Sequence, residues 1–226
     1  MINSEKKPKI SVIIAAYNAE QYIGRCLRSL IKQTIQHTEY EIIVIDDGSN
    51  DNTPYALDLF VDPKSSNVKV ITNNVNLGLP ASLNKGVKVA RGDYIVRVDS
   101  DDFVNVNFLN FLSYYLDTNS YSDAVACDYL LIDDMENEIS RLNAMKEPIA
   151  CGIMFRKEKV FATGLYDEEF LCHEDKDFRI RFEKKFAISH LEIPLYRYRR
   201  HGKNITNNKK LMETHYQNLI SKHGQP

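Results

Sequence analysis

Residues 10–18 read ISVIIAAYN, and this stretch decides the fold that we expect. Its first seven residues form an almost continuous apolar run rich in β-branched side chains, which is typical of a strand buried on both faces of a parallel sheet. Asn18 and Gln21 then have the spacing of a capping box, and apolar residues recur at helical spacing. These residues are Tyr22, Cys26, Leu27, Leu30 and Ile31. The stretch therefore predicts a strand that leads directly into an amphipathic helix.

The same alternation continues through the first hundred residues. A further buried strand is expected at 42–45 (IIVI), and a third and a fourth strand are expected at 68–71 and 94–98 (YIVRV). Thr53 and Pro54 supply an N-cap and a first-turn proline for a second helix, and a third helix is expected over 79–92. Strands that alternate with helices predict an α/β fold with a mainly parallel, twisted sheet flanked by helices.

The second half of the chain has a mixed pattern. Helices are expected near 108–115 and 174–185, and extended segments at 123–132, 148–156 and 188–199, the last with a turn at Pro194. No internal repeat or low-complexity linker marks a second domain. With 226 residues, the chain is long enough for one domain with a sizeable core and too short for two of ordinary size. We therefore expect a single domain over 1–226.

The composition excludes several classes of protein. Lys and Arg total 29 against 31 Asp and Glu, so no basic surface for nucleic acid is expected. The longest apolar run, near 10–17, is far short of the roughly 18 residues of a spanning helix, and MINSEKKPKI lacks the pattern of a signal peptide. We therefore expect a cytoplasmic protein without a transmembrane segment. Because no C-x-x-C pair occurs, the cysteines are expected to be reduced, buried thiols.

Polar and acidic residues follow three of the predicted strands. They are Tyr17 and Asn18, then Asp46 and Asp47, then Asp99, Asp101 and Asp102. In open parallel sheets, ligands bind in the crevice beyond the carboxyl ends of the strands, so these side chains are expected to meet there. Up to five carboxylates would repel one another unless a cation compensates their charge, and oxygen clusters suit Mg²⁺ or Mn²⁺. No glycine-rich phosphate loop is present, so we expect a divalent cation to bridge a diphosphate.

The sequence resembles the inverting family-two glycosyltransferases with the GT-A fold. Five segments match in family order from about residue 9 to residue 206. They are SVIIAAYNAEQYI, EIIVIDDGSNDNT, NLGLPASLNKGVKVARGDYIVRVDSDD, HEDKDFRIRF and YRRHGKNIT. The resemblance implies a Rossmann-like, mainly parallel sheet with a nucleotide-sugar-binding half at 9–104, a mixed acceptor and catalytic-base half at 105–206, and a tail at 207–226.

The resemblance also implies roles for the residues at the strand ends. Tyr17 and Asp46 match the pair that holds the nucleobase and ribose, with Asn18 and Asp47 beside them in the donor site. Asp99-Ser100-Asp101 matches the D-x-D motif, in which Asp99 approaches the ribose or the metal and Asp101 coordinates the metal. Arg97 matches the arginine of an R-x-D-x-D-D variant of this motif.

Two further segments complete the implied site. Asp175, in the Glu174-Asp175 motif, resembles the catalytic base, and Arg200 or His201 is expected to reach the diphosphate when the donor binds. The chain departs from many relatives at Ser82-Leu83-Asn84, where they read A-R-N, and it contains no tryptophan. Both departures concern donor and acceptor details rather than the reaction class.

The function implied is transfer of a hexosyl or N-acetylhexosaminyl group from a nucleotide-diphosphate sugar, most simply a UDP-sugar, with Mn²⁺ or Mg²⁺. The acceptor expected is a saccharide or a lipid-linked glycan in polysaccharide synthesis, in the cytoplasm or at the inner face of the membrane, with peripheral membrane contact.

Other interpretations remain open from the residues alone. Asp46 and Asp47 are also typical turn residues, Asp99 to Asp102 could cap a helix, and Glu174 with Asp175 would favour the positive end of a helix dipole. A sugar-phosphate nucleotidyltransferase is the first alternative function, although its glycine-rich N-terminal loop is missing. The second is a non-catalytic nucleotide-sugar binding module.

Overall fold

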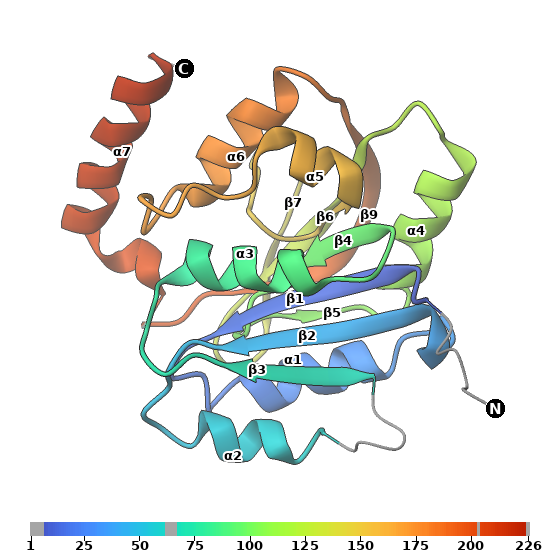
Figure 1. Cartoon of the computed structure of the whole chain (residues 1–226), viewed down its shortest axis with the longest axis vertical. Coiled ribbons are helices and arrows are strands. Elements are labelled where there is room, and N and C mark those ends of the chain that lie inside the picture. The colour runs from blue at the N-terminus through green and yellow to red at the C-terminus, as the bar shows by residue number, and fades with distance from the viewer. Residues whose placement is uncertain (1–6, 62–66, 203, 225–226) are drawn as a thin grey trace.

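The computed structural model describes residues 7–61, 67–202 and 204–224, and a single mixed β-sheet runs through its centre (Figure 1). One half of the sheet is parallel and has the order β3-β2-β1-β4. Its strands are β1 (Ile10–Ala16), β2 (Tyr40–Asp46), β3 (Val68–Thr72) and β4 (Tyr94–Arg97). Almost every side chain of β1 and β2 is buried, as the continuous apolar runs predict.

The other half of the sheet mixes both strand directions and continues the order as β8-β6-β9-β5. Its strands are β5 (Phe103–Val104), β6 (Ala124–Ile132), β8 (Ile153–Arg156) and β9 (Ile188–Arg199), and β7 (Glu138–Leu142) pairs with β6 off this path. β6 and β9 are parallel, whereas β4 with β8, β6 with β8 and β5 with β9 are antiparallel. The predicted α/β class, with a parallel first half and a mixed second half, is confirmed.

Helices cover both faces of the sheet (Figure 1). On one face lie α1 (Ile23–Ile31) and α4 (Phe108–Thr118), and on the other lie α3 (Leu79–Val89), α5 (Lys157–Thr163) and α6 (Glu174–Glu183). Alternate side chains of β1 point to opposite faces of the sheet. Val12 and Ile14 pack with α1, whereas Ile13 packs with α3. α2 (Thr53–Asp58) adjoins α1, α7 (Lys209–His223) adjoins α6, and two 3₁₀ turns lie at His37–Glu39 and Ile205–Asn207.

Several local predictions were wrong. Asn18 does not cap α1, which begins at Ile23 after Tyr22, and instead has a φ of 51° and accepts a hydrogen bond from the Asn50 amide at 2.8 Å. The second helix begins with Thr53, so its N-cap is one residue earlier. Pro194 makes no turn but lies within β9, where the pairing register with β6 shifts. The predicted tail contains a 15-residue helix, α7.

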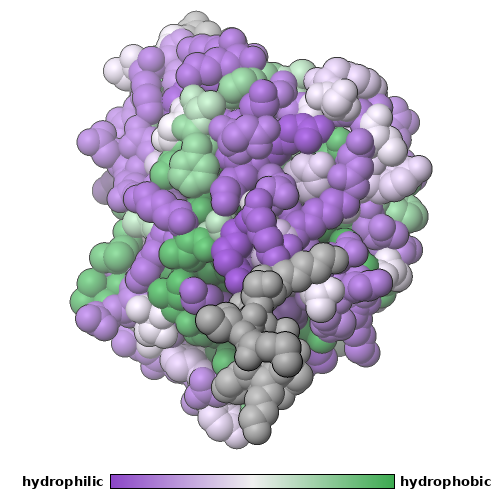
Figure 2. All heavy atoms as spheres, turned by 45° about the vertical axis from the view of Figure 1, so that its right-hand side comes forward, coloured by the Kyte–Doolittle hydropathy of each residue, from purple (hydrophilic) through white to green (hydrophobic). Residues whose placement is uncertain are grey.

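Apolar side chains are concentrated inside these layers. Figure 2 shows a face on which hydrophilic side chains predominate and hydrophobic ones gather in smaller areas. Within the described ranges, no helix combines the length and the apolar character that crossing a membrane requires. All four cysteines are buried and form no disulfide.

Candidate donor and catalytic site

A cleft of about 840 Å³ opens at the carboxyl ends of β1, β2 and β4, where a parallel sheet is expected to bind its ligand. The N-terminal end of α6 and residues of α7 complete its walls. Nine of the residues predicted for the site line this cleft. They are Tyr17, Asn18, Asp47, Arg97, Asp99, Asp101, Glu174, Asp175 and His201. The topology therefore brings together residues that lie up to 184 positions apart in the chain.

Two of the predicted site residues, Asp46 and Arg200, do not line the cleft. Asp46 is the last residue of β2 and is buried, and its Oδ1 accepts a hydrogen bond from the Ser49 amide at 3.1 Å. Arg200 follows β9 with its side chain exposed, whereas the preceding Arg199 points inward. Asp46 and Arg200 therefore do not line the cleft, and their parts in donor binding stay predictions.

Asp47, the residue directly after β2, has a carboxylate that lines the cleft. Its oxygens accept hydrogen bonds from the amides of Leu77 and Gly78, both at 2.9 Å, and from the Asn73 side chain at 2.8 Å. Gly78 precedes α3 with a φ of 92°, a conformation that favours glycine. Asp47 therefore fixes the loop between β3 and α3 as one wall of the cleft.

A chain of ion pairs joins the D-x-D motif to α6. Arg97 donates from Nε to Asp99 Oδ1 at 2.6 Å and from Nη2 to Asp99 Oδ2 at 3.2 Å, while its Nη1 lies 2.8 Å from Glu174 Oε1. The side chains of Arg97 and Glu174 are only 7% and 5% exposed. Burial raises the pKa of Glu174 to about 7, although the Arg97 charge opposes this rise. Arg97 thus holds two carboxylates from distant parts of the chain.

Asp101, the second acid of the motif, lies beside His201. His201 Nε2 is 2.9 Å from Asp101 Oδ2, and the imidazole stacks on Tyr22 with ring centroids 4.7 Å apart. Asn204 Nδ2 approaches the same oxygen at 3.3 Å. Burial, and then the neighbouring Asp99 carboxylate, raise the pKa of Asp101. A cation near Asp99 and Asp101 would relieve this repulsion.

A second acidic cluster is less suited to a metal. Ligand atoms of Asp99, Asp102 and Cys151 lie within 4.8 Å of one another. Asp102, however, accepts hydrogen bonds from Tyr196 Oη and from the Arg199 amide, both at 2.7 Å. Burial raises the pKa of the Cys151 thiol, which disfavours the thiolate that binds metals. The oxygen atoms of Asp99 and Asp101, which face the cleft, fit the hard cations Mg²⁺ and Mn²⁺ better.

The predicted base lies at the beginning of α6. His173, the residue before this helix, has a φ of 63°, and its Nε2 lies 3.2 Å from the Met212 carbonyl oxygen of α7. Glu174 is buried, whereas Asp175 is partly exposed and lines the cleft. The carboxylate of Asp175 is therefore accessible to a bound substrate, while that of Glu174 belongs to the ion-pair chain with Arg97.

Several cleft residues were not predicted from the sequence. They include Tyr22, Asn204, Leu211, Met212 and the segment 148–150. Leu211 and Met212 belong to α7, which lies in the segment predicted to be a tail. The one local signal for that helix is Asn208, whose side chain accepts a hydrogen bond from the Leu211 amide as an N-cap.

A Rossmann-like sheet that presents a D-x-D motif to a cleft beyond its strand ends defines the GT-A class of glycosyltransferases. The family model described as "Glycosyl transferase family 2" matches residues 11–191. The chain therefore belongs to glycosyl transferase family 2, and the predicted family is confirmed.

Relatives in sequence carry glycosyltransferase names. An uncharacterized glycosyltransferase of Haemophilus influenzae is 29% identical over an alignment of 240 residues, gaps included, which covers 96% of this chain and 72% of that protein. A poly(ribitol-phosphate) beta-glucosyltransferase of Bacillus spizizenii is 45% identical over 97 residues, which cover 42% of this chain and 15% of that protein.

Solved structures share the fold. TarS of S. aureus in complex with UDP-GlcNAc has a TM-score of 0.75 at 23% identity, over 94% of this chain and 66% of that one. The mannosyltransferase PcManGT from Pyrobaculum calidifontis, in complex with GDP-Man and Mn²⁺, has a TM-score of 0.74 at 16% identity, over 97% of this chain and 66% of that one. The chain thus spans about two thirds of the length of both, and the GT-A fold is confirmed.

Proposed function

We propose that the protein is a metal-dependent, inverting glycosyltransferase. It transfers a hexosyl or N-acetylhexosaminyl group from a nucleotide-diphosphate sugar, a UDP-sugar in the first instance, to a hydroxyl of a saccharide or lipid-linked glycan. The observation that carries this proposal is the opening of Asp99, Asp101 and Asp175 onto one cleft, two of them at a strand end and the third on a separate helix.

The metal-binding part of the proposal rests on the D-x-D motif. Mn²⁺ or Mg²⁺ would be held by Asp101 with Asp99, and such a cation, when bound, neutralises charge on a diphosphate leaving group. Tyr17, Asn18 and Asp47 line the neighbouring part of the cleft and would contact the nucleoside. His201, which contacts Asp101, would lie beside the diphosphate. Asp46 and Arg200 would support this site from outside the cleft.

The chemical step needs one carboxylate that accepts a proton. In the proposed displacement, the acceptor oxygen forms a bond to the anomeric carbon, the bond to the diphosphate oxygen breaks, and the hydroxyl proton passes to Asp175. A positioned general base of this kind contributes about 10²- to 10⁴-fold to the rate. Glu174 would orient the base by fixing the first turn of α6 through Arg97.

Relatives support the choice of substrates. TarS has been solved with UDP-GlcNAc and PcManGT with GDP-Man and Mn²⁺, which favours a nucleotide-sugar donor and a divalent cation. The sequence relatives include poly(ribitol-phosphate) glycosyltransferases, which favours synthesis of a polysaccharide. We accordingly propose action in the cytoplasm or at the inner face of the membrane, with residues 9–104 binding the donor and 105–206 the acceptor.

The proposal is tested with purified protein, MnCl₂ and a panel of nucleotide sugars. Binding is followed by thermal shift, since a ligand specific for the folded state raises stability, and hydrolysis is followed by nucleotide release. Asp101→Ala should lose metal-dependent donor binding, whereas Asp175→Asn should keep binding and lose turnover by about 10²- to 10⁴-fold. If no nucleotide sugar binds in the presence of metal, the proposed function is wrong.

A further inference from the structure

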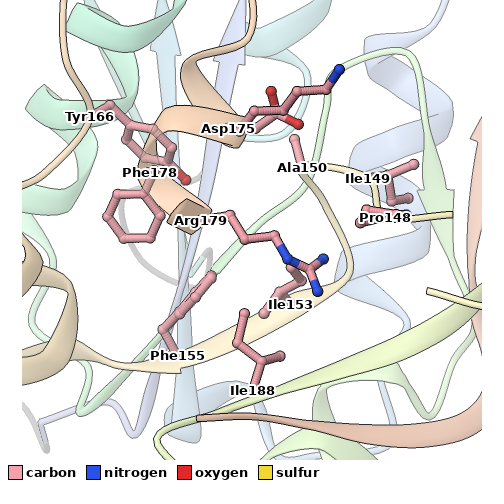
Figure 3. Close-up of a pocket in the computed structure, with 11 residues that line it drawn as sticks. Pro148, Ile149, Ala150, Ile153, Phe155, Tyr166, Asp175, Phe178, Arg179 and Ile188 are labelled. Atoms are coloured by element: carbon pink, nitrogen blue, oxygen red, sulfur yellow. The ribbon is translucent and has the colours of Figure 1, made fainter. Parts of the chain in front are cut away.

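A second, smaller cavity adjoins the cleft and shares Asp175 with it. Its volume is about 50 Å³, which is enough for one small substituent, because a single water needs roughly 10–15 Å³. Apart from Asp175, Lys176, Tyr166 and Arg179, its lining is apolar (Figure 3). The apolar lining residues are Pro148, Ile149, Ala150, Ile153, Phe155, Phe178 and Ile188.

The cavity and the cleft are separated by a thin wall. Residues 148–150, Asp175 and Lys176 line both spaces. Asp47, Asp99 and Asp101, by contrast, line only the cleft. A group in the small cavity would therefore touch the proposed base without contacting the donor carboxylates, as an acceptor that gives its proton to Asp175 must.

One polar group in this apolar cavity has unused hydrogen-bonding capacity. Arg179 donates from Nε to Glu183 Oε1 at 2.9 Å, and its Nη2 has only a weak 4.0 Å contact with the Met145 sulfur. Its Nη1 is buried and has no hydrogen-bond partner among the described residues. Figure 3 shows the guanidinium directed between Ile149, Ile153 and Ile188. A buried N–H without an acceptor costs about 1–3 kcal/mol, so an acceptor supplied by a ligand would be favoured there.

We propose that this cavity binds the acetamido group of an N-acetylated acceptor sugar. Because Nη1 is buried, the guanidinium turns toward the cavity as the ligand enters, and the acetamido carbonyl oxygen then accepts its hydrogen bond. The acetyl methyl packs against Ile149 and Ile153. This assignment rests on the proposed glycosyltransferase function and adds the chemical class of the acceptor.

The charge of the cavity favours an acetamido group over a phosphate or a carboxylate. Glu183 pairs with the Arg179 guanidinium, and the Asp175 carboxylate lines the cavity together with Lys176, so each cation that an anionic substituent would meet is accompanied by a carboxylate. An anion placed among seven apolar side chains would lose its hydration without full compensation, whereas a neutral carbonyl needs only one donor. A plain hydroxyl would satisfy the N–H but would leave the apolar walls without contact.

The test uses pairs of sugars that differ only at the 2-substituent. Binding is measured by saturation-transfer NMR, with UDP and Mg²⁺ present, for the methyl glycosides of N-acetylglucosamine and glucose, N-acetylgalactosamine and galactose, and N-acetylmannosamine and mannose. In at least one pair, the N-acetyl sugar should bind about tenfold to a hundredfold more tightly, with the strongest saturation at the acetyl methyl. Arg179→Met should remove most of this preference, while Lys184→Met, a change on the exposed end of the same helix, should keep it.

Different results identify different errors. If no N-acetyl sugar binds better than its 2-hydroxyl partner, or if the Arg179→Met variant keeps the preference, the acetamido assignment is refuted. Failure of the proposed function is recognised separately, because the wild-type protein would then hydrolyse no nucleotide sugar. Ala150→Leu places a larger side chain where the two spaces meet and fills part of the small cavity, so it should reproduce the loss of preference. It provides a second variant should Arg179→Met fold poorly.

Discussion

Glu174→Gln should remove a pH-dependent loss of stability. The wild-type carboxyl is 5% exposed, and burial raises its pKa from 4.5 to about 7 in the folded protein. Because the folded state holds this proton more tightly than the unfolded chain, the group destabilises the fold as pH rises from 4.5 to 7. The shift corresponds to about 3 kcal/mol, at roughly 1.4 kcal/mol for each pH unit between the two pKa values.

The assay is urea unfolding of both proteins between pH 4 and pH 8. Effects of titrating groups distant from Glu174 are common to both proteins, so the difference in the free energy of unfolding reports Glu174 and the charges next to it. This difference should change by about 3 kcal/mol in favour of the variant over the range, mostly between pH 4.5 and 7. Loss of the hydrogen bond to Arg97 adds an offset that does not depend on pH in this range.

A matched control is Glu158→Gln, which changes an exposed residue in the first turn of α5. Its difference from the wild type should stay nearly constant with pH. If the difference for Glu174→Gln is equally flat, Glu174 is not a buried acid with a raised pKa, and the account of the Arg97 ion-pair chain is wrong.

Two other substitutions test the framework that holds the site. Asp177 is fully buried and contacts Arg181, Lys222 and His223. Asp177→Ala should therefore lower the free energy of unfolding by about 3–5 kcal/mol in urea. An unchanged midpoint of urea unfolding would contradict the structure. Gly92→Ala would place a Cβ 2.6 Å from the Ser11 backbone nitrogen and should cost at least about 1–3 kcal/mol by thermal or urea unfolding. In the control Gly24→Ala, in α1, the new Cβ meets only the flexible end of the Arg28 side chain. This substitution should be neutral or should stabilise the protein by up to about 1 kcal/mol. A loss of stability as large as that of Gly92→Ala would refute the steric argument.

The parallel half of the fold was predictable because its information is local. Strands buried on both faces need nearly continuous apolar runs, and 10–16 and 42–45 supply them, whereas the run at 68–71 is interrupted by a lysine and forms the edge strand β3. Once those strands are parallel, their ends must share one edge of the sheet. For that reason Tyr17, Asp47 and Asp99, which are far apart in the chain, could be placed in one cleft before any coordinates were considered.

The remaining features depend on contacts that a linear reading does not contain. Pro194 is accommodated within β9 because the register of β6 shifts there, between Cys127 and Tyr129, and a proline lacks an N–H for a regular ladder. α7 has little amphipathic pattern, and its position depends on ion pairs with the buried Asp177. Which of Asp46 and Asp47 enters the cleft depends on where β2 ends, a boundary that the apolar pattern leaves uncertain by a residue or two.

The first turn of α6 carries two aspartates with unlike surroundings. Asp175 opens onto the cleft, while Asp177, two residues later, is enclosed with Arg181 and the end of α7. A mutational scan that scores only product formation would therefore show a loss of activity at both positions. At Asp175 the loss would come from the chemical step, and at Asp177 from a smaller amount of folded protein. Soluble yield and ligand occupancy have to be recorded with turnover before any acidic position on this helix is credited with a part in the reaction.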